Sequence, residues 1–254
     1  MKTKQGEARN KGDGRLHGLK GLMGARMRQL KISAFLGILA MAAVAFPIRT
    51  QAAATLSLFD GVNPLITVVD NGPGDMFGAT GAILVRTNVG VWQLSISSAV
   101  TKPLFGSATD PVMDLGITAS SVSAGSLTIV FSDNGFGPST GILHAIVDGQ
   151  NTGAPATVTY DVYGDPANVV GATTIHIASI GTSPLPVTAT GSGPLTLPTP
   201  FSLTQIDRFD ATGATTINSD ASFNVTPVPE PTGMALAVLG LAAFALGSLH
   251  RKRA

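Results

Sequence analysis

Hydrophobic and polar residues alternate in several stretches of the chain between residues 55 and 226. A period of two is the pattern of a β-strand that buries one face and exposes the other. The predicted inward sets are Trp92, Leu94 and Ile96; Leu127, Ile129 and Phe131; and Val158, Tyr160 and Val162. In the stretch TTIHIAS, the same period places Ile175 and Ile177 inside and His176 on the polar face.

Turn-forming residues separate these runs. Asp-Asn-Gly occurs at 70–72 and again at 133–135, Asn-Val-Gly at 88–90 and Asp-Gly at 148–149. The spacing predicts about ten strands with no helices between them, whereas a parallel sheet needs crossover helices. The fold class predicted for residues 55–226 is therefore all-β, either an antiparallel β-sandwich or a jelly-roll-like arrangement.

The first 54 residues have the layout of a secretory signal peptide. Arg28 and Lys31 precede a mostly apolar stretch over 32–46, and Ala52–Ala54 supplies the small residues of a cleavage site, which predicts a mature protein beginning at Thr55. A buried core helix would leave the flanking charges unexplained. Residues 1–26 are either a long polar start of this signal or precede a true start at Met27. Signal peptidase and the general secretion machinery are the expected partners.

The last 28 residues contain a second apolar run with a different layout. The triplet Pro229, Glu230 and Pro231 precedes 17 mostly apolar residues over 233–249, and Arg251, Lys252 and Arg253 follow within the basic tail 250–254. A helix of that length spans roughly 25 Å, slightly less than a bilayer core of about 30 Å. The basic residues would stop transfer and remain cytoplasmic. The sequence thus predicts a transmembrane helix, with the β domain outside.

Charge is distributed unevenly along the chain. Residues 1–54 carry ten Lys and Arg against Glu7 and Asp13, a net charge of +8, and residues 227–254 carry +2. Residues 55–226 carry twelve Asp against three basic residues, a net charge of −9. An acidic domain repels nucleic acid, so no nucleic-acid partner is expected. The chain has no cysteine, which excludes disulfides and thiolate catalysis.

Two Asp-rich turns are candidates for a calcium site. Asp70, Asn71 and Asp75 lie close together in one predicted turn, and Asp133 and Asn134 in another. Oxygen ligands on adjacent loops suit calcium. Asp and Asn also occupy turns because their side chains cap the local backbone, and the spacing is not that of the twelve-residue calcium loop.

Catalytic signals are weak. Residues 137–141 match the G-x-S-x-G pattern around Ser139, but a nucleophile elbow needs a helix after it, and here a strand is predicted. His144 lies between Ile142 and Ile146, which favours a core or interface histidine over a catalytic one. Glycosidases commonly use paired carboxylates, but twelve Asp residues select no pair. A secreted hydrolase is the most remote alternative, and no catalytic residue is assigned.

The C-terminal segment 227–254 resembles the PEP-CTERM sorting signal of Gram-negative bacteria, on the order of Pro-Glu-Pro, apolar span and Arg-Lys-Arg tip. The resemblance implies an exosortase-like inner-membrane enzyme as partner and processing at Pro229, Glu230 and Pro231. It also implies an inner-membrane intermediate and delivery to the cell surface or extracellular matrix. Similar tails carry a family label taken from ice-binding proteins, which alone implies no ice binding. The stretches 101–107, 126–133 and 201–205 further resemble PEP-CTERM ectodomains that have no assigned chemistry.

Together these features predict a non-enzymatic exported surface or matrix protein, associated with exopolysaccharide or biofilm. The alternative is a carbohydrate-binding module, with or without calcium assistance. Alternation turns Trp92 and Tyr160 inward and leaves Tyr163 as the exposed ring available for sugar stacking.

Overall fold

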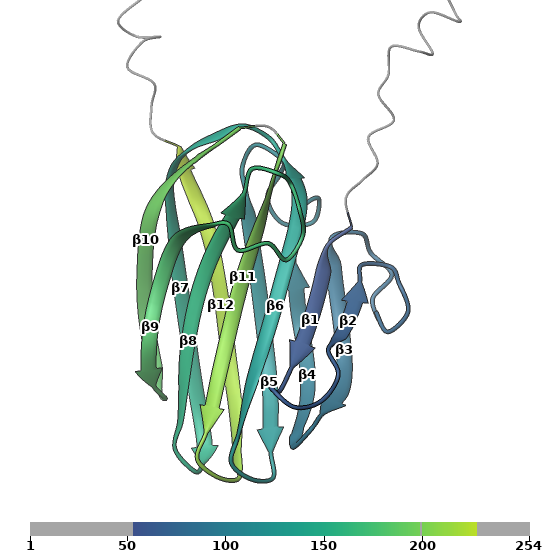
Figure 1. The fold of residues 1–254 in the computed structure, drawn as a ribbon, viewed down its shortest axis with the longest axis vertical. Coiled ribbons are helices and arrows are strands. Elements are labelled where there is room, and N and C mark those ends of the chain that lie inside the picture. The colour runs from purple at the N-terminus through teal and green to yellow at the C-terminus, as the bar shows by residue number, and fades with distance from the viewer. Residues whose placement is uncertain (1–52, 199, 228–254) are drawn as a thin grey trace, which may run out of the picture. The chain divides into compact units, whose positions relative to one another are not determined.

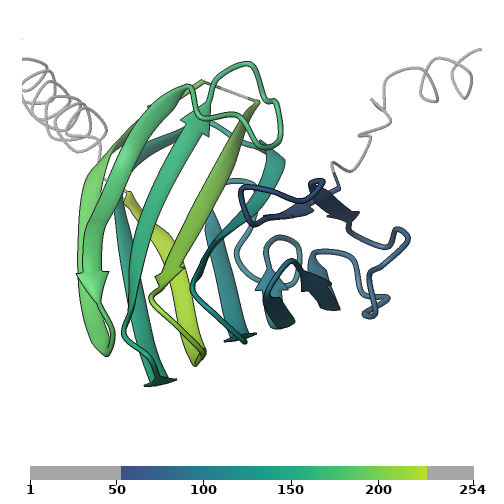
Figure 2. The same ribbon diagram turned by 60° about the horizontal axis from the view of Figure 1, so that its bottom comes forward.

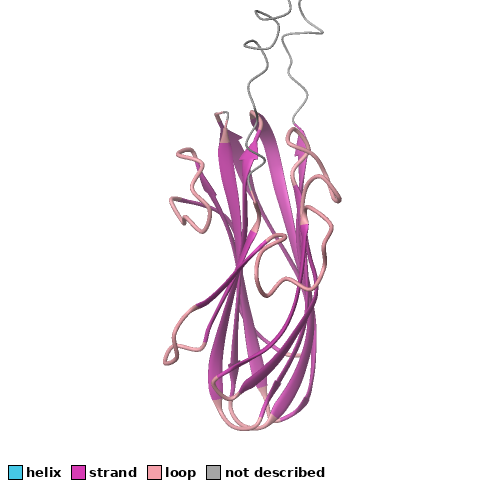
Figure 3. Ribbon diagram, turned by 90° about the vertical axis from the view of Figure 1, so that its right-hand side faces the viewer, coloured by secondary structure: helices cyan, strands magenta, loops and turns pink. Residues whose placement is uncertain are grey.

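The computed structural model describes residues 53–198 and 200–227, which form two antiparallel β-sheets packed face to face (Figure 1). The described residues are strands joined by loops and contain no helix (Figure 3). The all-β, sandwich-like prediction is confirmed for this part of the chain. It contains twelve strands rather than about ten.

Each sheet has six strands, and we call them sheet A and sheet B. In spatial order sheet A contains β2 (Ile66–Val69), β1 (Thr55–Phe59), β6 (Gly125–Phe136), β11 (Phe201–Ala211), β8 (Ala156–Asp165) and β9 (Ile175–Pro184). Sheet B contains β10 (Val187–Leu197), β7 (Ser139–Gly153), β12 (Thr215–Pro227), β5 (Val112–Ser121), β4 (Trp92–Val100) and β3 (Ala82–Val89). From β5 to β8 the chain changes sheet at every turn, so sequence neighbours face each other across the core.

The core lies between the inner faces of the two sheets, as the alternation predicts. Trp92, Ile129 and Tyr160 are at most 1% exposed, and the other inward sets listed above for β4, β6 and β8 are buried with them. Burying apolar surface at about 25 cal/mol per Å² makes this core the main source of stability.

At one edge of the sandwich, glycines allow strands of the two sheets to approach each other closely. β9 of sheet A and β10 of sheet B run side by side at this edge (Figure 2). A side chain at Gly193 would overlap the backbone carbonyl of Ile177, and one at Gly191 would lie 2.6 Å from the carbonyl oxygen of Ser179. The two backbones therefore come this close only because β10 has no Cβ at these positions.

The interior also holds polar side chains from β11. Gln205 and Asp207 point inward between Leu203 and Phe209, and all four are fully buried. The Tyr160 hydroxyl donates a 2.7 Å hydrogen bond to Oε1 of Gln205. Both carboxyl oxygens of Asp207 are buried without a hydrogen-bond partner among the described atoms.

Residues 1–52 of the predicted signal peptide, the Pro-Glu-Pro triplet, the apolar segment 233–249 and the basic tip lie outside the described residues. No helix within residues 53–198 and 200–227 has the length and apolar character of a membrane span.

Candidate functional site

The outer face of sheet B is covered with polar side chains. Alternate residues of its strands point away from the core, and on four adjacent strands these are mainly hydroxyl, amide and carboxyl groups. They include Gln93 and Ser95 on β4, Thr118 and Ser120 on β5, Asn218 and Asp220 on β12, and Asp148 and Gln150 on β7. This face provides many hydrogen-bond donors and acceptors. The strand residues described on it include no aromatic side chain.

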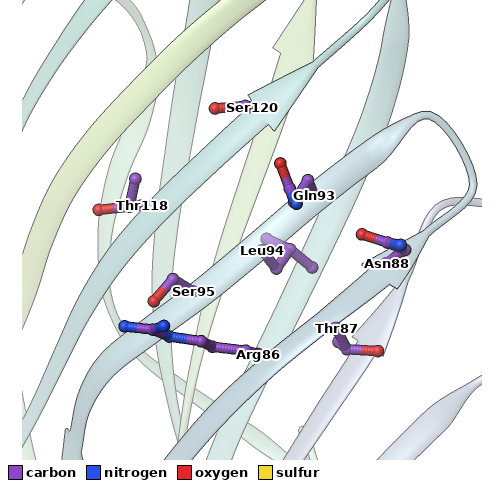
Figure 4. Close-up of a pocket in the computed structure, with 8 residues that line it drawn as sticks. All are labelled: Arg86, Thr87, Asn88, Gln93, Leu94, Ser95, Thr118 and Ser120. Carbon is purple, nitrogen blue, oxygen red and sulfur yellow. The ribbon is translucent and has the colours of Figure 1, made fainter.

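Two hollows adjoin on this face, with volumes of about 440 and 450 Å³. The first lies over β3, β4 and β5, where its lining includes Arg86, Asn88 and Gln93 (Figure 4). The second lies over β5, β12 and β7, where its lining includes Asn218 and Gln150. Thr118 lines both, so the hollows form one polar surface that crosses the strands.

Hydrogen bonds between strands hold part of this surface in place. The Thr118 hydroxyl donates to Oδ1 of Asn218 at 2.9 Å, and the hydroxyls of Ser120 and Thr216 lie 3.0 Å apart. Side chains fixed in this way lose less conformational freedom when a ligand binds.

Two carboxyl residues, Asp148 and Asp220, line the second hollow, and a third, Asp114, lies close to them in the strand register. Asp148 on β7 and Asp220 on β12 are direct cross-strand partners, and Asp114 on β5 lies diagonally from Asp220. Burial and the neighbouring Asp220 carboxyl raise the pKa of Asp114 from 3.8 to about 6, while a hydrogen bond from Ser98 opposes the shift. The structure therefore shows which two Asp carboxyl groups lie close together. The sequence could not identify them, because only the strand register brings residues 114 and 220 together.

The first predicted calcium turn uses its oxygens to organise the backbone. Asp70 accepts from the Gly81 amide at 2.7 Å, and Asp75 accepts from the amides of Asn71 and Phe77 at 2.9 Å each. Burial raises the pKa of Asp70, with a smaller contribution from the Asp75 charge. The alternative of turn capping therefore accounts for these contacts.

The second predicted turn, at 133–135, is instead part of strand β6, and Asp133 forms an ion pair there. Lys102 donates to Oδ2 of Asp133 at 2.6 Å and to the carbonyl of Asn134, and its ammonium lies 4.1 Å from the ring centre of Phe136. Burial raises the pKa of Asp133, although Lys102 opposes the shift. Within the described residues, no group of three or more His, Cys, Asp or Glu side chains is arranged to hold a metal ion. Calcium thus remains a hypothesis from sequence.

The outer face of sheet A carries a different cluster, centred on Asp161 of β8. Its Oδ1 accepts from the Ser179 hydroxyl at 2.7 Å and lies 3.1 Å from Nε2 of His176, and its Oδ2 accepts from Nη1 of Arg208 at 2.8 Å. Burial alone would raise the pKa of Asp161, but the hydrogen bonds from Ser179, Arg208 and His176 outweigh it and hold the pKa below its usual value. The Tyr163 ring packs on the His176 ring, with the ring centres 4.9 Å apart.

The position of His176 confirms one sequence prediction, and that of Ile175 corrects another. His176 is exposed on the polar face as predicted, but Ile175 is 42% exposed, while Ile177 is buried. A register shift in β9 makes Ala178 the partner of Val162 and His176 the partner of Tyr163, which leaves Ile177 as an extra residue. The bulge buries both Ile177 and its neighbour Ala178, which the period of two does not predict.

Neither the Ser139 pattern nor the Asp161 cluster has the geometry of a serine-hydrolase site. Residues 137–138 form a loop and Ser139 begins β7, so the helix of a nucleophile elbow is absent there. His144 is exposed with Ile142 and Ile146 on the outer face, so it is not a core histidine, and the interface alternative stays a prediction. Ser179 and His176 both contact the same oxygen of Asp161, whereas a catalytic triad needs the serine on the histidine.

Neither a protein-family model nor a curated protein matches the chain. Among solved structures, the enzymatically active domain of a bacteriophage CBA120 tailspike protein is similar at 9% identity and TM-score 0.29, covering 55% of this chain and 20% of that one. A family 61 carbohydrate-binding module in complex with β-1,4-galactotriose is similar at 7% identity and TM-score 0.31, covering 53% and 88%. A Clostridium thermocellum xylanase fragment with a family 22 module, complexed with xylohexaose, follows at 13% identity and TM-score 0.28, covering 46% and 22%. At these TM-scores the likeness decides neither the fold nor the function of this chain.

Proposed function

We propose that this chain is an exported, non-enzymatic surface or matrix protein that binds neutral polysaccharide on the outer face of sheet B. The observation that carries the proposal is the pair of adjoining hollows joined at Thr118 and lined mainly by hydroxyl and amide groups, together with Arg86, Asp148 and Asp220. An extended glycan presents hydroxyl groups along its length, and each matches a donor or acceptor of this kind.

The energetics suit a long ligand better than a small one. A single hydrogen bond exchanged with water contributes only about 0.5–1.5 kcal/mol, so binding needs several such contacts in a row. The two hollows extend across β3, β4, β5, β12 and β7, which provides that length. The net charge of −9 over residues 55–226 disfavours anionic polymers and supports a neutral one.

The Asp114–Asp220 carboxyl pair bears on whether the protein binds a glycan or hydrolyses it. Glycosidases hold their two carboxyl groups roughly 5 Å apart or more, so that the reacting carbon or a water fits between them. Asp220 lines the second hollow but Asp114 does not, so the two carboxyl groups do not both face a sugar bound there. We therefore assign these carboxyls no catalytic role.

Export enters the proposal through the sequence. The signal layout in residues 1–54 and the sorting layout in residues 227–254 support passage through the general secretion machinery, removal of the signal by signal peptidase, and processing by an exosortase-like enzyme. Delivery to the cell surface or matrix would place the domain among extracellular polysaccharides.

Affinity gel electrophoresis tests the proposed binding face. The purified protein is run through gels containing galactan, xylan, galactomannan or hydroxyethylcellulose, with calcium or with a chelator. We expect retardation by at least one polymer, unaffected by calcium because the oxygens of Asp75 and Asp133 are already engaged.

A point substitution locates the binding. Thr118→Leu removes the hydroxyl shared by both hollows and should weaken retention at least tenfold, about 1.4 kcal/mol. Thr196→Leu on β10 is the matched control, because Thr196 is equally exposed on the same sheet but lines neither hollow. Equal retention of wild type and Thr118→Leu would exclude this face as the binding surface.

A further inference from the structure

The outer face of sheet A has features of a built site that the hollows on sheet B do not share. Tyr163 and His176 are cross-strand partners on β8 and β9, and their rings form a tilted pair with an interplanar angle of 34°. The side chain of His176 is 49% exposed. The pair therefore presents a partly apolar platform to solvent, which Trp92 and Tyr160 cannot do because both are buried.

The bulge in β9 creates this arrangement. In an uninterrupted strand, His176 and Ser179 would point to opposite faces, because they are three residues apart. The extra residue Ile177 shifts the alternation, so both side chains reach Asp161 on the outer face. Bulges of this kind are known to re-aim side chains beside functional sites.

Asp161 acts as the fixed centre of the cluster. Only 11% of its side chain is exposed, and its contacts with Ser179, His176 and Arg208 hold three side chains from β9 and β11 around it. The side chain of Arg208 is 42% exposed and bonds to Asp161 through Nη1, and its other guanidinium N–H groups have no hydrogen-bond partner among the described residues.

We infer that this cluster is a second sugar-binding site, and that one molecule joins two polysaccharide chains through its opposite faces. A pyranose ring would stack its C–H face on the Tyr163–His176 platform, while its hydroxyls accept from Arg208. The ligand class is a neutral glycan, because Asp161 offsets Arg208 locally and the domain is acidic overall.

The inference extends the proposed function. It rests on that function for the polysaccharide bound on sheet B. The outer faces of two packed sheets point in opposite directions, so glycans bound on sheet A and sheet B do not compete for space. A protein with one site on each face can bind two polymers at once and thereby cross-link them.

Histidine NMR tests the site on sheet A directly. The chain has four histidines, His17, His144, His176 and His250, and His176→Gln identifies the signal of interest. Cellotriose, xylotriose, mannotriose and galactotriose are titrated separately. At least one should shift the His176 ring signal saturably, and the His144 signal, from the outer face of sheet B, reports binding to that face separately. No saturable shift with any of the four overturns the inference.

Two variants then separate the faces. Tyr163→Ala removes the platform and should abolish the saturable His176 shift, whereas Tyr163→Phe keeps the ring and should preserve it. Thr157→Ala, on the same face of β8, is the matched control. Thr118→Leu should leave the shift intact. If Tyr163→Ala retains the full shift with wild-type affinity, the platform is not the site.

A bridging assay tests the cross-link. One polysaccharide from the gel panel is fixed to a plate, the protein is bound, and the same polymer carrying a fluorescent label is added. The wild type should capture the labelled polymer. Tyr163→Ala should still bind the plate through sheet B but lose at least nine-tenths of the captured label. If Tyr163→Ala binds the plate and captures as much labelled polymer as the wild type, the second site is refuted and the proposed function is unaffected. If the wild type does not bind the plate, the proposed function itself is refuted.

Discussion

Asp207 is an acidic residue placed where a β-sandwich ordinarily keeps apolar side chains. It is fully buried, and burial raises its pKa well above 3.8, with Asp220 and Asp161 adding to the shift. The folded protein therefore keeps a proton on Asp207 that the unfolded chain releases above about pH 4. The free energy of unfolding should therefore fall as the pH rises above about 4.

Asp207→Asn removes this requirement and should stabilise the protein at pH 7.5 by about 1–3 kcal/mol. Near pH 3.5 the gain should be much smaller, because the carboxyl is then largely protonated in both states. Urea unfolding at the two pH values measures the difference. The exposed Asp110→Asn is the control and should change little. A loss of stability at pH 7.5 would mean that Asp207 is ionised and bound by a partner.

The residue scale shows where the sequence is informative and where it is not. The period of two correctly predicts that Trp92 and Tyr160 are buried. It does not reveal that Gln205 and Asp207 face the core, because on β11 both faces are buried over residues 201–207. Loop contacts such as Ser202 Oγ to the carbonyl of Val169 cover the outer side of this strand, and no local pattern reports them.

At the scale of elements, the edge between β9 and β10 depends on glycine. Gly193→Ala would place a methyl group against the carbonyl of Ile177, and the backbones can separate only by losing contacts across this edge. We expect a loss of about 2–4 kcal/mol in the free energy of unfolding, measured by urea denaturation. Gly181→Ala on β9 is the control, since a Cβ there meets nothing within 4 Å. Equal stability of both variants would contradict this close approach.

The central strand β6 provides a second test at this scale. Ile129 is fully buried, so Ile129→Ala should leave a cavity and cost about 2–5 kcal/mol. Its neighbour Thr128 points to the outer face, and Thr128→Ala should cost far less. A loss of less than about 1 kcal/mol at Ile129, in thermal or urea unfolding, would place that face of β6 outside the core.

Strand existence was predictable, but strand pairing was not. The periodic runs around Trp92, Ile129 and Tyr160 each become a strand, because alternation is local information. The pairing of β12 with both β5 and β7 joins residues 62 to 112 positions apart, and this pairing creates both the Asp148–Asp220 contact and the second hollow. For the same reason, the candidate sites on both faces could not be assembled from spacing alone.

At the scale of the whole molecule, the C-terminal segment should control location without affecting the fold. Replacing Pro229, Glu230 and Pro231 with Ala should leave the stability of the β domain within about 0.5 kcal/mol, because the triplet follows the last strand, which ends at Pro227. In a host that carries an exosortase, we expect the variant to accumulate in the inner membrane and the wild type at the surface or in the matrix. Cell fractionation measures this. If the variant and the wild type fractionate identically, the triplet acts only as a spacer and not as a sorting signal.

The central claim is that this domain holds polysaccharide without cutting it, and one pull-down assay tests both halves. The purified protein is incubated with insoluble galactan, xylan, mannan and cellulose. Protein in the pellet and reducing sugar ends in solution are then measured in the same tubes. We expect saturable pelleting with at least one polymer and no increase in reducing ends over a no-protein control. Reducing ends that accumulate with time and vanish in Asp114→Asn would make the protein a hydrolase, and no pelleting with any polymer would contradict the account.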